Sequence, residues 1–275
     1  MALSWIHIFA LAGIQGFAGI LPLSDAGFLT IGRKLMGLPV DGSGDGFYSA
    51  LLQIAAAVVI CLVFRKDLAA CMGLRARRSR RKEAVYQSEG ELNHRMFLLV
   101  LIALLPMLFV LFLRPKTVAL AWNLPAVAGL FLLNGLIIFL CDRVGHGRRS
   151  LPEATITDSL LLGFAQALSA IPGLSGMGLA ITVGIIRGLN PGFCVRFSCL
   201  LLIPLNFIRG IVQLFTALGT ARFSLSYFAG ILLCGICSYF SLWLLRYMAK
   251  RESLSEFAYM AWGVGLFTFC IYLFS

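Results

Sequence analysis

The sequence predicts an all-α polytopic membrane protein with about six transmembrane helices and two re-entrant helix–loop segments in an inverted-topology repeat. Three observations support this prediction: an apolar composition, six apolar runs of spanning length, and two broken apolar stretches that resemble each other. Of the 275 residues, 60% are hydrophobic and 13% are charged, which is more apolar than a soluble core of this size requires. We expect a single membrane domain over residues 1–275.

Six apolar runs are long enough to cross the hydrocarbon core of a bilayer as helices. They cover residues 47–64, 97–113, 118–141, 197–218, 224–246 and 257–274. Two more apolar stretches, residues 2–31 and 155–186, are interrupted by Gly, Pro and polar side chains. Non-helical backbone at membrane depth is tolerated only where protein or a wet cavity covers it. Both broken stretches should therefore meet in the interior of the bundle.

The basic residues predict which ends of these segments face the cytoplasm. Nine of the 23 Lys and Arg residues fall between Arg65 and Arg95. The positive-inside rule places this loop, residues 65–95, in the cytoplasm. If residues 155–186 enter and return on one side, most of the other basic residues lie inside too, which favours a re-entrant segment. The basic run indicates anionic lipid head groups as neighbours, and we expect no nucleic-acid partner.

The cysteines and histidines do not predict a redox or metal site. Cys234 and Cys237 form a CxxC pattern inside an apolar run, where small packing residues are the simpler interpretation. His7, His94 and His146 stand far apart in the sequence. We therefore predict no metal centre from these residues.

The two broken stretches form an internal repeat, "QGFAGILPLSDAG" (15–27) and "QALSAIPGLSGMG" (166–178). Each opens with Gln, continues to a Pro, and then has a Ser followed three residues later by a Gly. Three spanning runs follow each copy, and this odd number inverts the second copy relative to the first. The predicted halves are residues 1–141 and 155–275. Inverted repeats of transporters place the binding site near the membrane midplane, where the two breaks face each other.

At these residues the sequence resembles the bacterial undecaprenyl-diphosphate phosphatase family, the bacitracin-resistance proteins. The framework matches after Gln53, in "GFAQALSAIPGLS" from Gly163 and in "RFSCLLLIP" from Arg196. The resemblance covers nearly the whole chain. It implies a polyprenyl-phosphate or diphosphate lipid as the partner and the bacterial inner membrane as the location.

The catalytic residues of the family's first signature are changed in this chain. That signature reads roughly E-G-x-x-E-F-L-P-V-S-S-T-G-H. Gln15 and Gly19 stand at the two Glu positions. Asp25 replaces the second Ser, Ala26 the Thr, and Phe28 the His. The two Glu suit a hard divalent cation, and Gln and Gly do not replace them.

The second signature, P-G-x-S-R-S-G-x-T, is changed in the same way. Gly176 stands at the Arg position, Met177 at the second Ser and Ala180 at the Thr. Diphosphate hydrolysis needs a cation or a fixed Arg to neutralise the developing charge, and an activated nucleophile or water. From these residues we expect a catalytically degenerate member of the family. It would use Mg²⁺ or Ca²⁺ as a cofactor only if activity remains.

Our hypothesis from the sequence is a lipid-binding protein that translocates a polyprenyl phosphate, since paired re-entrant segments suit alternating access. One alternative is an active undecaprenyl-diphosphate phosphatase with a remodelled site, using Asp25, Ser24 and Ser175 as its catalytic candidates. A second alternative is a non-catalytic partner subunit in envelope synthesis. The oligomeric state is left open between a monomer and a homodimer.

The candidate lipid-phosphate ligands share one property, a position at or beside one of the two breaks or a charge at membrane depth. They are Gln15, Ser24, Asp25, Gln166, Gly173, Ser175, Gly176 and Arg209. Each has a simpler interpretation as well. Asp25 and the glutamines could cap broken helices, the glycines could permit close helix crossing, and Arg209 could extend to the interface.

Overall fold

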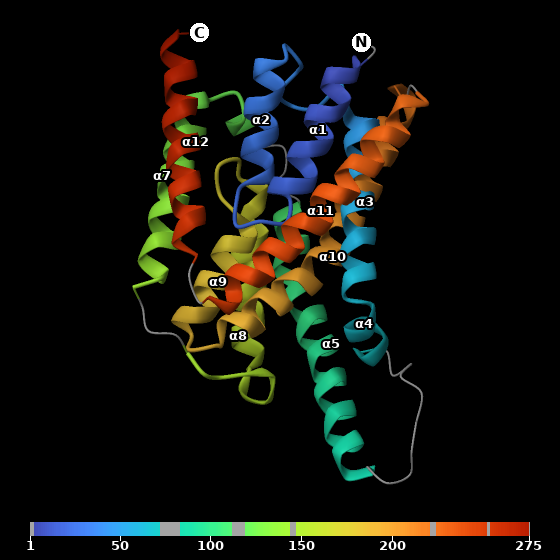
Figure 1. Ribbon diagram of the computed structural model, residues 1–275, viewed down its shortest axis with the longest axis vertical. Helices are drawn as coiled ribbons and strands as arrows, with labels where there is room; N and C mark the ends of the chain where they lie inside the picture. The colour runs from blue at the N-terminus through green and yellow to red at the C-terminus, as the bar shows by residue number, and fades with distance from the viewer. Residues whose placement is uncertain are drawn as a thin grey trace.

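The computed structural model describes residues 3–71, 83–111, 119–143, 147–220, 224–251 and 254–274, and these ranges are almost wholly helical (Figure 1). The basic run at 75–82 and His146 lie outside the described residues. Helices of the first half are α1 (Trp5–Ala18), α2 (Asp25–Leu35), α3 (Gly46–Val63), α4 (Arg65–Cys71), α5 (Glu83–Leu111) and α7 (Leu124–Cys141).

The second half follows the same order of elements. Its helices are η2 (Leu151–Glu153), α8 (Ile156–Ala167), η3 (Leu168–Ala170), α9 (Gly176–Ile186), α10 (Pro191–Ala217), η4 (Leu218–Thr220), α11 (Ser226–Lys250) and α12 (Ser255–Phe274). In both halves a broken helix pair is followed by longer apolar helices.

The prediction of a polytopic membrane protein is confirmed. Within the described residues, α3, α7, α10, α11 and α12 are each long and apolar enough to cross a membrane. The sixth expected run, 97–113, falls in α5, whose described apolar part is His94–Phe109. Within the run expected at 118–141, α7 begins at Leu124, where Asn123 is the N-cap and Pro125 occupies the first turn.

Contacts between helices follow the internal repeat. The broken helix α1 packs on α11 of the other half, and its counterpart α8 packs on α5. The counterparts α3 and α10 pack on each other, as do α7 and α12. The two halves are therefore interleaved through exchanged contacts, the arrangement expected when two copies of one motif are related by a pseudo-two-fold axis.

Each broken pair begins and ends at one end of the molecule. The pair α1–α2 lies toward the end that carries both chain termini, and α8–α9 lies toward the opposite end (Figure 1). At that opposite end, Arg149 forms a short bridge with Leu189, with Arg149 N donating to Gly188 O at 3.1 Å and Asn190 N donating to Arg149 O at 2.8 Å. That either pair is re-entrant in a bilayer stays a prediction.

The serines that the repeat predicts cap the two broken helices, and one of them, Ser24, also joins the two breaks. Ser24 is the N-cap of α2, and its Oγ accepts from Gly27 N at 3.1 Å; Ser175 is the N-cap of α9, and its Oγ accepts from Gly178 N at 3.1 Å. Ser24 Oγ also accepts from Gly173 N at 2.9 Å. Both hydroxyls are buried. The breaks therefore meet inside the bundle, as the sequence predicts.

Glycine is required at this crossing for two reasons. A Cβ on Gly27 would lie 2.6 Å from the ring of Phe131 and 2.7 Å from Gly173 N. Gly173 itself has a φ of +101°, which side-chain-bearing residues rarely adopt. These two glycines allow the backbones of the two halves to approach closely enough for the Ser24 hydrogen bond.

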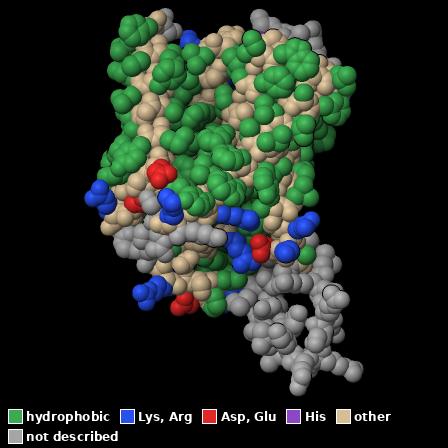
Figure 2. Space-filling model, viewed as in Figure 1, with side chains coloured by type: hydrophobic (Ala, Val, Ile, Leu, Met, Phe, Trp, Pro, Cys, Tyr) green, Lys and Arg blue, Asp and Glu red, His purple; other side chains and the backbone are tan. Residues whose placement is uncertain are grey.

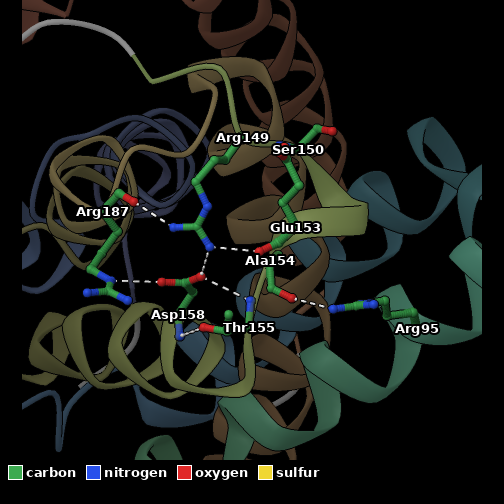
Figure 3. A network of polar contacts seen from close by, with 8 residues as sticks. All are labelled: Arg95, Arg149, Ser150, Glu153, Ala154, Thr155, Asp158 and Arg187. Carbon is green, nitrogen blue, oxygen red and sulfur yellow. Dashed lines mark hydrogen bonds and ion pairs between the residues drawn. The ribbon is translucent and has the colours of Figure 1, made fainter.

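The end of the molecule opposite the termini is held by a charged network (Figure 3). We call it the basic end, and it is formed by residues 147–158, residues 186–196 and α4. Asp158, in the first turn of α8, accepts from Arg149 Nη2 and from Arg187 Nε, both at 2.8 Å. Asp158 also accepts from Thr155 N at 3.0 Å. The network thus ties the start of α8 to the segments before α8 and after α9.

The same contacts set the protonation of Asp158, which lies outside the spanning helices. Burial alone would raise its pKa, but the hydrogen bonds from Thr155, Arg187 and Arg149 outweigh burial and lower it to about 2. The carboxylate is therefore ionised throughout the physiological range, and both arginines keep their counterion.

Removing the shared cap should destabilise the fold. We expect Ser24→Ala to lower the free energy of unfolding by about 1–3 kcal/mol, because two buried N–H groups lose their acceptor. Ser175→Ala leaves one such N–H group without its acceptor, so it should lower the free energy of unfolding by less. Thermal unfolding of the purified protein in detergent measures both. Ser4→Ala, which removes an exposed cap of α1, is the control, and an equal effect at all three serines would contradict the role of the crossing.

Asp158→Asn should destabilise the protein in a pH-dependent manner. The pKa of Asp158 in the fold lies below the unfolded value of about 3.9. Its stabilising effect is therefore complete above that value and is lost as the pH falls toward 2. We expect a difference of about 1–3 kcal/mol at neutral pH that shrinks below pH 4. Melting curves of wild type and variant across pH measure it, with exposed Glu256→Gln as the control. A pH-independent difference would contradict the ion-pair explanation.

Candidate functional site

A cavity of about 160 Å³ lies beside the crossing of the two breaks. The helices that line it are α1, α2, α3, α5, α8, η3 and α10, and they come from both halves of the chain. The polar side chains that line it are Gln15, Asp25, Thr30, Arg33, Asp41, Gln53, Ser169, Arg209 and Gln213. Apolar residues such as Leu29, Met107 and Leu205 complete the lining.

Arg209 reaches the cavity between the two breaks. Its Nη2 donates to Ser169 Oγ at 2.7 Å, and its Nη1 lies 3.8 Å from Asp25 Oδ2. Ser169 belongs to η3, and Asp25 is the first residue of α2, next to the Ser24 cap. The interpretation of Arg209 as a snorkelling side chain is therefore wrong. Its guanidinium, on the long helix α10, faces the cavity and lies between Asp25 of the first half and Ser169 of the second.

Arg33 is a second arginine at the cavity, and the sequence did not indicate it. It lies in the last turn of α2 and is 8% exposed. Its Nη2 is 2.9 Å from Asp45 Oδ2, its Nε donates to Asp45 Oδ1 at 3.1 Å, and Nη2 also donates to Ser49 Oγ at 3.2 Å. Arg33 is not among the ligands that the sequence predicted. A signal was present, since an Asp follows in the loop before the next helix.

Amide side chains supply further polar groups to the cavity. Gln53 Nε2 on α3 donates to Gln213 Oε1 on α10 at 2.9 Å. Gln15, at the family's first Glu position, is 2% exposed and lines the same space. Gln213 and Ser169 were not predicted. Gln213 lies outside both repeated stretches, and Ser169 lies inside the second one but has no counterpart in the first, where Ala18 stands at the matching position.

Five of the predicted ligands do not line the cavity: Ser24, Gln166, Gly173, Ser175 and Gly176. Both serine hydroxyls accept backbone N–H groups, and the N–H of Gly173 is donated to Ser24. Gln166 Nε2 donates to Ser198 O at 3.1 Å. In this structure these residues hold the backbone around the cavity in place without lining it. Direct contact with a ligand stays a prediction for each.

The position of the family's signature arginine is closed by packing. A Cβ on Gly176 would overlap the carbonyl oxygen of Gln166 and lie 2.6 Å from Ser169 Cβ. The start of α9 is therefore pressed against the turn that carries Ser169. The cationic group that contacts this turn is Arg209, which lies on the next helix, α10.

The donor set does not fit a resident divalent cation. Among the described residues, no three His, Cys, Asp or Glu side chains lie close enough to hold a metal ion. Asp25 and Asp41 line the cavity, whereas Mg²⁺ and Ca²⁺ prefer about six or more oxygen ligands. Asp25 also has Arg209 as its neighbour. We therefore derive no step through a protein-bound metal.

Comparison with known proteins decides the family. The model of the family described as "Bacitracin resistance protein BacA" matches residues 8–267, a range that includes both breaks and the whole cavity lining. The chain belongs to this family. It is accordingly a multi-pass protein of the bacterial inner membrane.

Curated relatives in the family are similar over most of their length. The chain is 30% identical to Undecaprenyl-diphosphatase 1 of Streptomyces coelicolor over 261 residues, which cover 94% of this chain and 92% of the relative. It is 27% identical to Undecaprenyl-diphosphatase 3 of Bacillus cereus over 275 residues, covering 96% of each. An undecaprenyl-diphosphatase of Chromohalobacter salexigens is 30% identical over 209 residues, 76% of each chain.

Filling the closed arginine position should disrupt the site. We expect Gly176→Ala to lower the free energy of unfolding by about 1–3 kcal/mol, because the added methyl group meets backbone and Ser169. Gly176→Arg should be at least as destabilising. The matched control is Gly13→Ala in α1, where an added Cβ meets nothing within 4 Å. Melting temperatures in detergent provide the measurement, and equal values for the two alanine variants would contradict the packing argument.

Proposed function

We propose that this protein is an undecaprenyl-diphosphate phosphatase with a remodelled site, which binds the diphosphate group of a polyprenyl lipid in the cavity and hydrolyses its anhydride bond. The observation that carries the proposal is the presence of Arg33, Arg209 and Asp25 in one cavity inside an apolar bundle. The names of the curated relatives support it, since they are undecaprenyl-diphosphatases.

The charges of the cavity suit a diphosphate. Ionisable side chains inside a membrane domain are costly and mark functional sites. Guanidinium groups match phosphate oxygens through paired N–H donors. A cavity of about 160 Å³ has room for the head group and not for a polyprenyl chain. The chain of the lipid would then run along the apolar outer surface of the bundle, which is covered by exposed Leu and Phe side chains.

The proposed reaction uses water and the side chains of the cavity. The water oxygen attacks the terminal phosphorus and the anhydride P–O bond breaks, which releases inorganic phosphate and leaves the polyprenyl monophosphate. Asp25 accepts a proton from the attacking water. Arg209, held by Ser169, stabilises negative charge on the phosphoryl oxygens as it develops.

A second candidate is binding without hydrolysis, followed by translocation of the lipid phosphate. It is favoured by Gln15, Gly19 and Gly176 at the family's catalytic positions and by a donor set that fits no resident metal. The interleaved halves support translocation by architecture alone. A non-catalytic partner subunit and a homodimer remain further hypotheses from the sequence.

Phosphate release from undecaprenyl diphosphate separates these candidates. We expect the purified full chain to release phosphate, Asp25→Asn to lose about 100-fold or more of that rate, and Arg209→Ala to lose a similar factor. The assay is run with Mg²⁺, with Ca²⁺ and with a chelator, and exposed Glu256→Gln is the control variant.

The outcomes are distinct. Lipid binding without phosphate release in any of the three conditions would overturn hydrolysis and support the second candidate. Movement of the head group across proteoliposomes would then separate translocation from a partner role. If the protein neither binds nor hydrolyses the lipid, the proposal for this cavity is wrong in both forms.

A further inference from the structure

A second hollow in the surface lies at the basic end, away from the cavity described above. It is an open groove of about 540 Å³ between α5 and the segment that leads into α8. His94 and Arg95 stand at its rim, and Leu98, Ile102 and Ile156 form its apolar wall. None of these residues lines the first cavity.

The cationic side of the groove is fixed in place by the network at the basic end. Arg95 Nη2 donates to Ala154 O at 2.8 Å, and Ala154 N donates to Ser150 O at 3.1 Å (Figure 3). Arg149, bound to Asp158, donates to the neighbouring Glu153 O at 2.7 Å. The Arg95 guanidinium is therefore held beside the groove by the Ala154 carbonyl, and the backbone around Ala154 is held in turn by Ser150 and Arg149. A side chain that is already ordered loses less conformational entropy when a ligand binds.

The acidic groups near the groove are engaged elsewhere. The Glu153 carboxylate accepts from Ser150 N at 3.0 Å. Asp158 accepts from Arg149, Arg187 and Thr155. Among the described side chains, an anion that approaches Arg95 and His94 therefore meets carboxylates that already accept from cationic or N–H groups.

The apolar wall of the groove belongs to the lipid-facing surface. Leu98 is 45% exposed and Ile156 is 59% exposed, as expected for side chains that contact acyl chains in a membrane protein. Figure 2 shows the same division on a larger scale, with apolar side chains over most of the visible face and Lys and Arg gathered toward the lower end. Apolar surface with a positive rim at the level of the aqueous boundary matches one phospholipid with an anionic head group.

We propose that this groove binds an anionic phospholipid of the cytoplasmic leaflet, with its phosphate at Arg95 and His94 and one acyl chain along Leu98, Ile102 and Ile156. Basic residues at the cytoplasmic face contribute about 1 kcal/mol each toward anionic lipid. Zwitterionic phospholipid brings the same acyl chains without net negative charge, so it should bind more weakly. The site is independent of the reaction proposed for the first cavity.

The test measures lipid retained by the full chain, by native mass spectrometry after titration with phosphatidylglycerol or phosphatidylcholine. We expect preference for phosphatidylglycerol, and a loss of about 5- to 30-fold in its affinity in the double variant His94→Ala/Arg95→Ala. Leu98→Trp, which fills the groove and keeps the His94 and Arg95 side chains, should weaken the binding of both lipids. Arg143→Ala is the matched control, since Arg143 lies over the ring of Phe139 outside the groove.

Because Arg95 also fastens α5 to Ala154, melting temperatures accompany every variant, and Leu98→Trp tests the groove without breaking that contact. Phosphate release by Leu98→Trp should equal that of the wild type, which separates this site from the first cavity. Unchanged phosphatidylglycerol affinity in both groove variants would overturn the proposal. An equal loss in Arg143→Ala would also overturn it, because it would show general attraction to the basic end.

Discussion

The hydrogen bonds at the hydroxyl of Ser24 are the constraint on which the rest of the structure depends. One buried oxygen accepts the Gly27 N–H of its own helix and the Gly173 N–H of the other half. Two broken helices inside an apolar bundle leave backbone N–H and C=O groups without water, and each such group that stays unpaired destabilises the fold. The shared cap satisfies one group from each half and so fixes the breaks against each other. Everything that lines the cavity is positioned relative to this crossing.

The charges of the cavity follow directly from that geometry. Asp25 succeeds the cap in sequence, and Ser169 precedes the second break by a few residues, so the crossing brings both to the same place. Arg209 on α10 then contacts Ser169 and faces Asp25. In the family signature a cation stands at the start of α9, where this chain has Gly176. In this chain the packing at Gly176 is closed, and the cation that contacts the same turn is Arg209 of the neighbouring helix α10.

The sequence was sufficient for the parts of the structure that local pattern determines. The repeated Gln, Pro, Ser and Gly predicted two breaks and their meeting, and Asp25 stood out as a carboxylate at depth. The serines were predicted as ligands, yet their hydroxyls accept backbone N–H groups, because a broken helix needs a cap before it can hold anything else. Gln213 was missed because it joins the cavity through packing between segments far apart in the sequence, which no local pattern encodes. Arg33 and Ser169 were missed although each had a local signal: an Asp follows Arg33 in the loop after α2, and Ser169 lies inside the second repeated stretch.

The loose pairing of Asp25 with Arg209 bears on whether this cavity hydrolyses or only binds. Their closest charged atoms are 3.8 Å apart, while Arg209 makes a hydrogen bond of 2.7 Å to Ser169. Arg33, in contrast, is bound to Asp45 through two nitrogens. An arriving diphosphate would therefore compete for Arg209 more readily than for Arg33. Once Arg209 faces the phosphate, the Asp25 carboxylate has lost its cationic neighbour and is available to accept a proton from water.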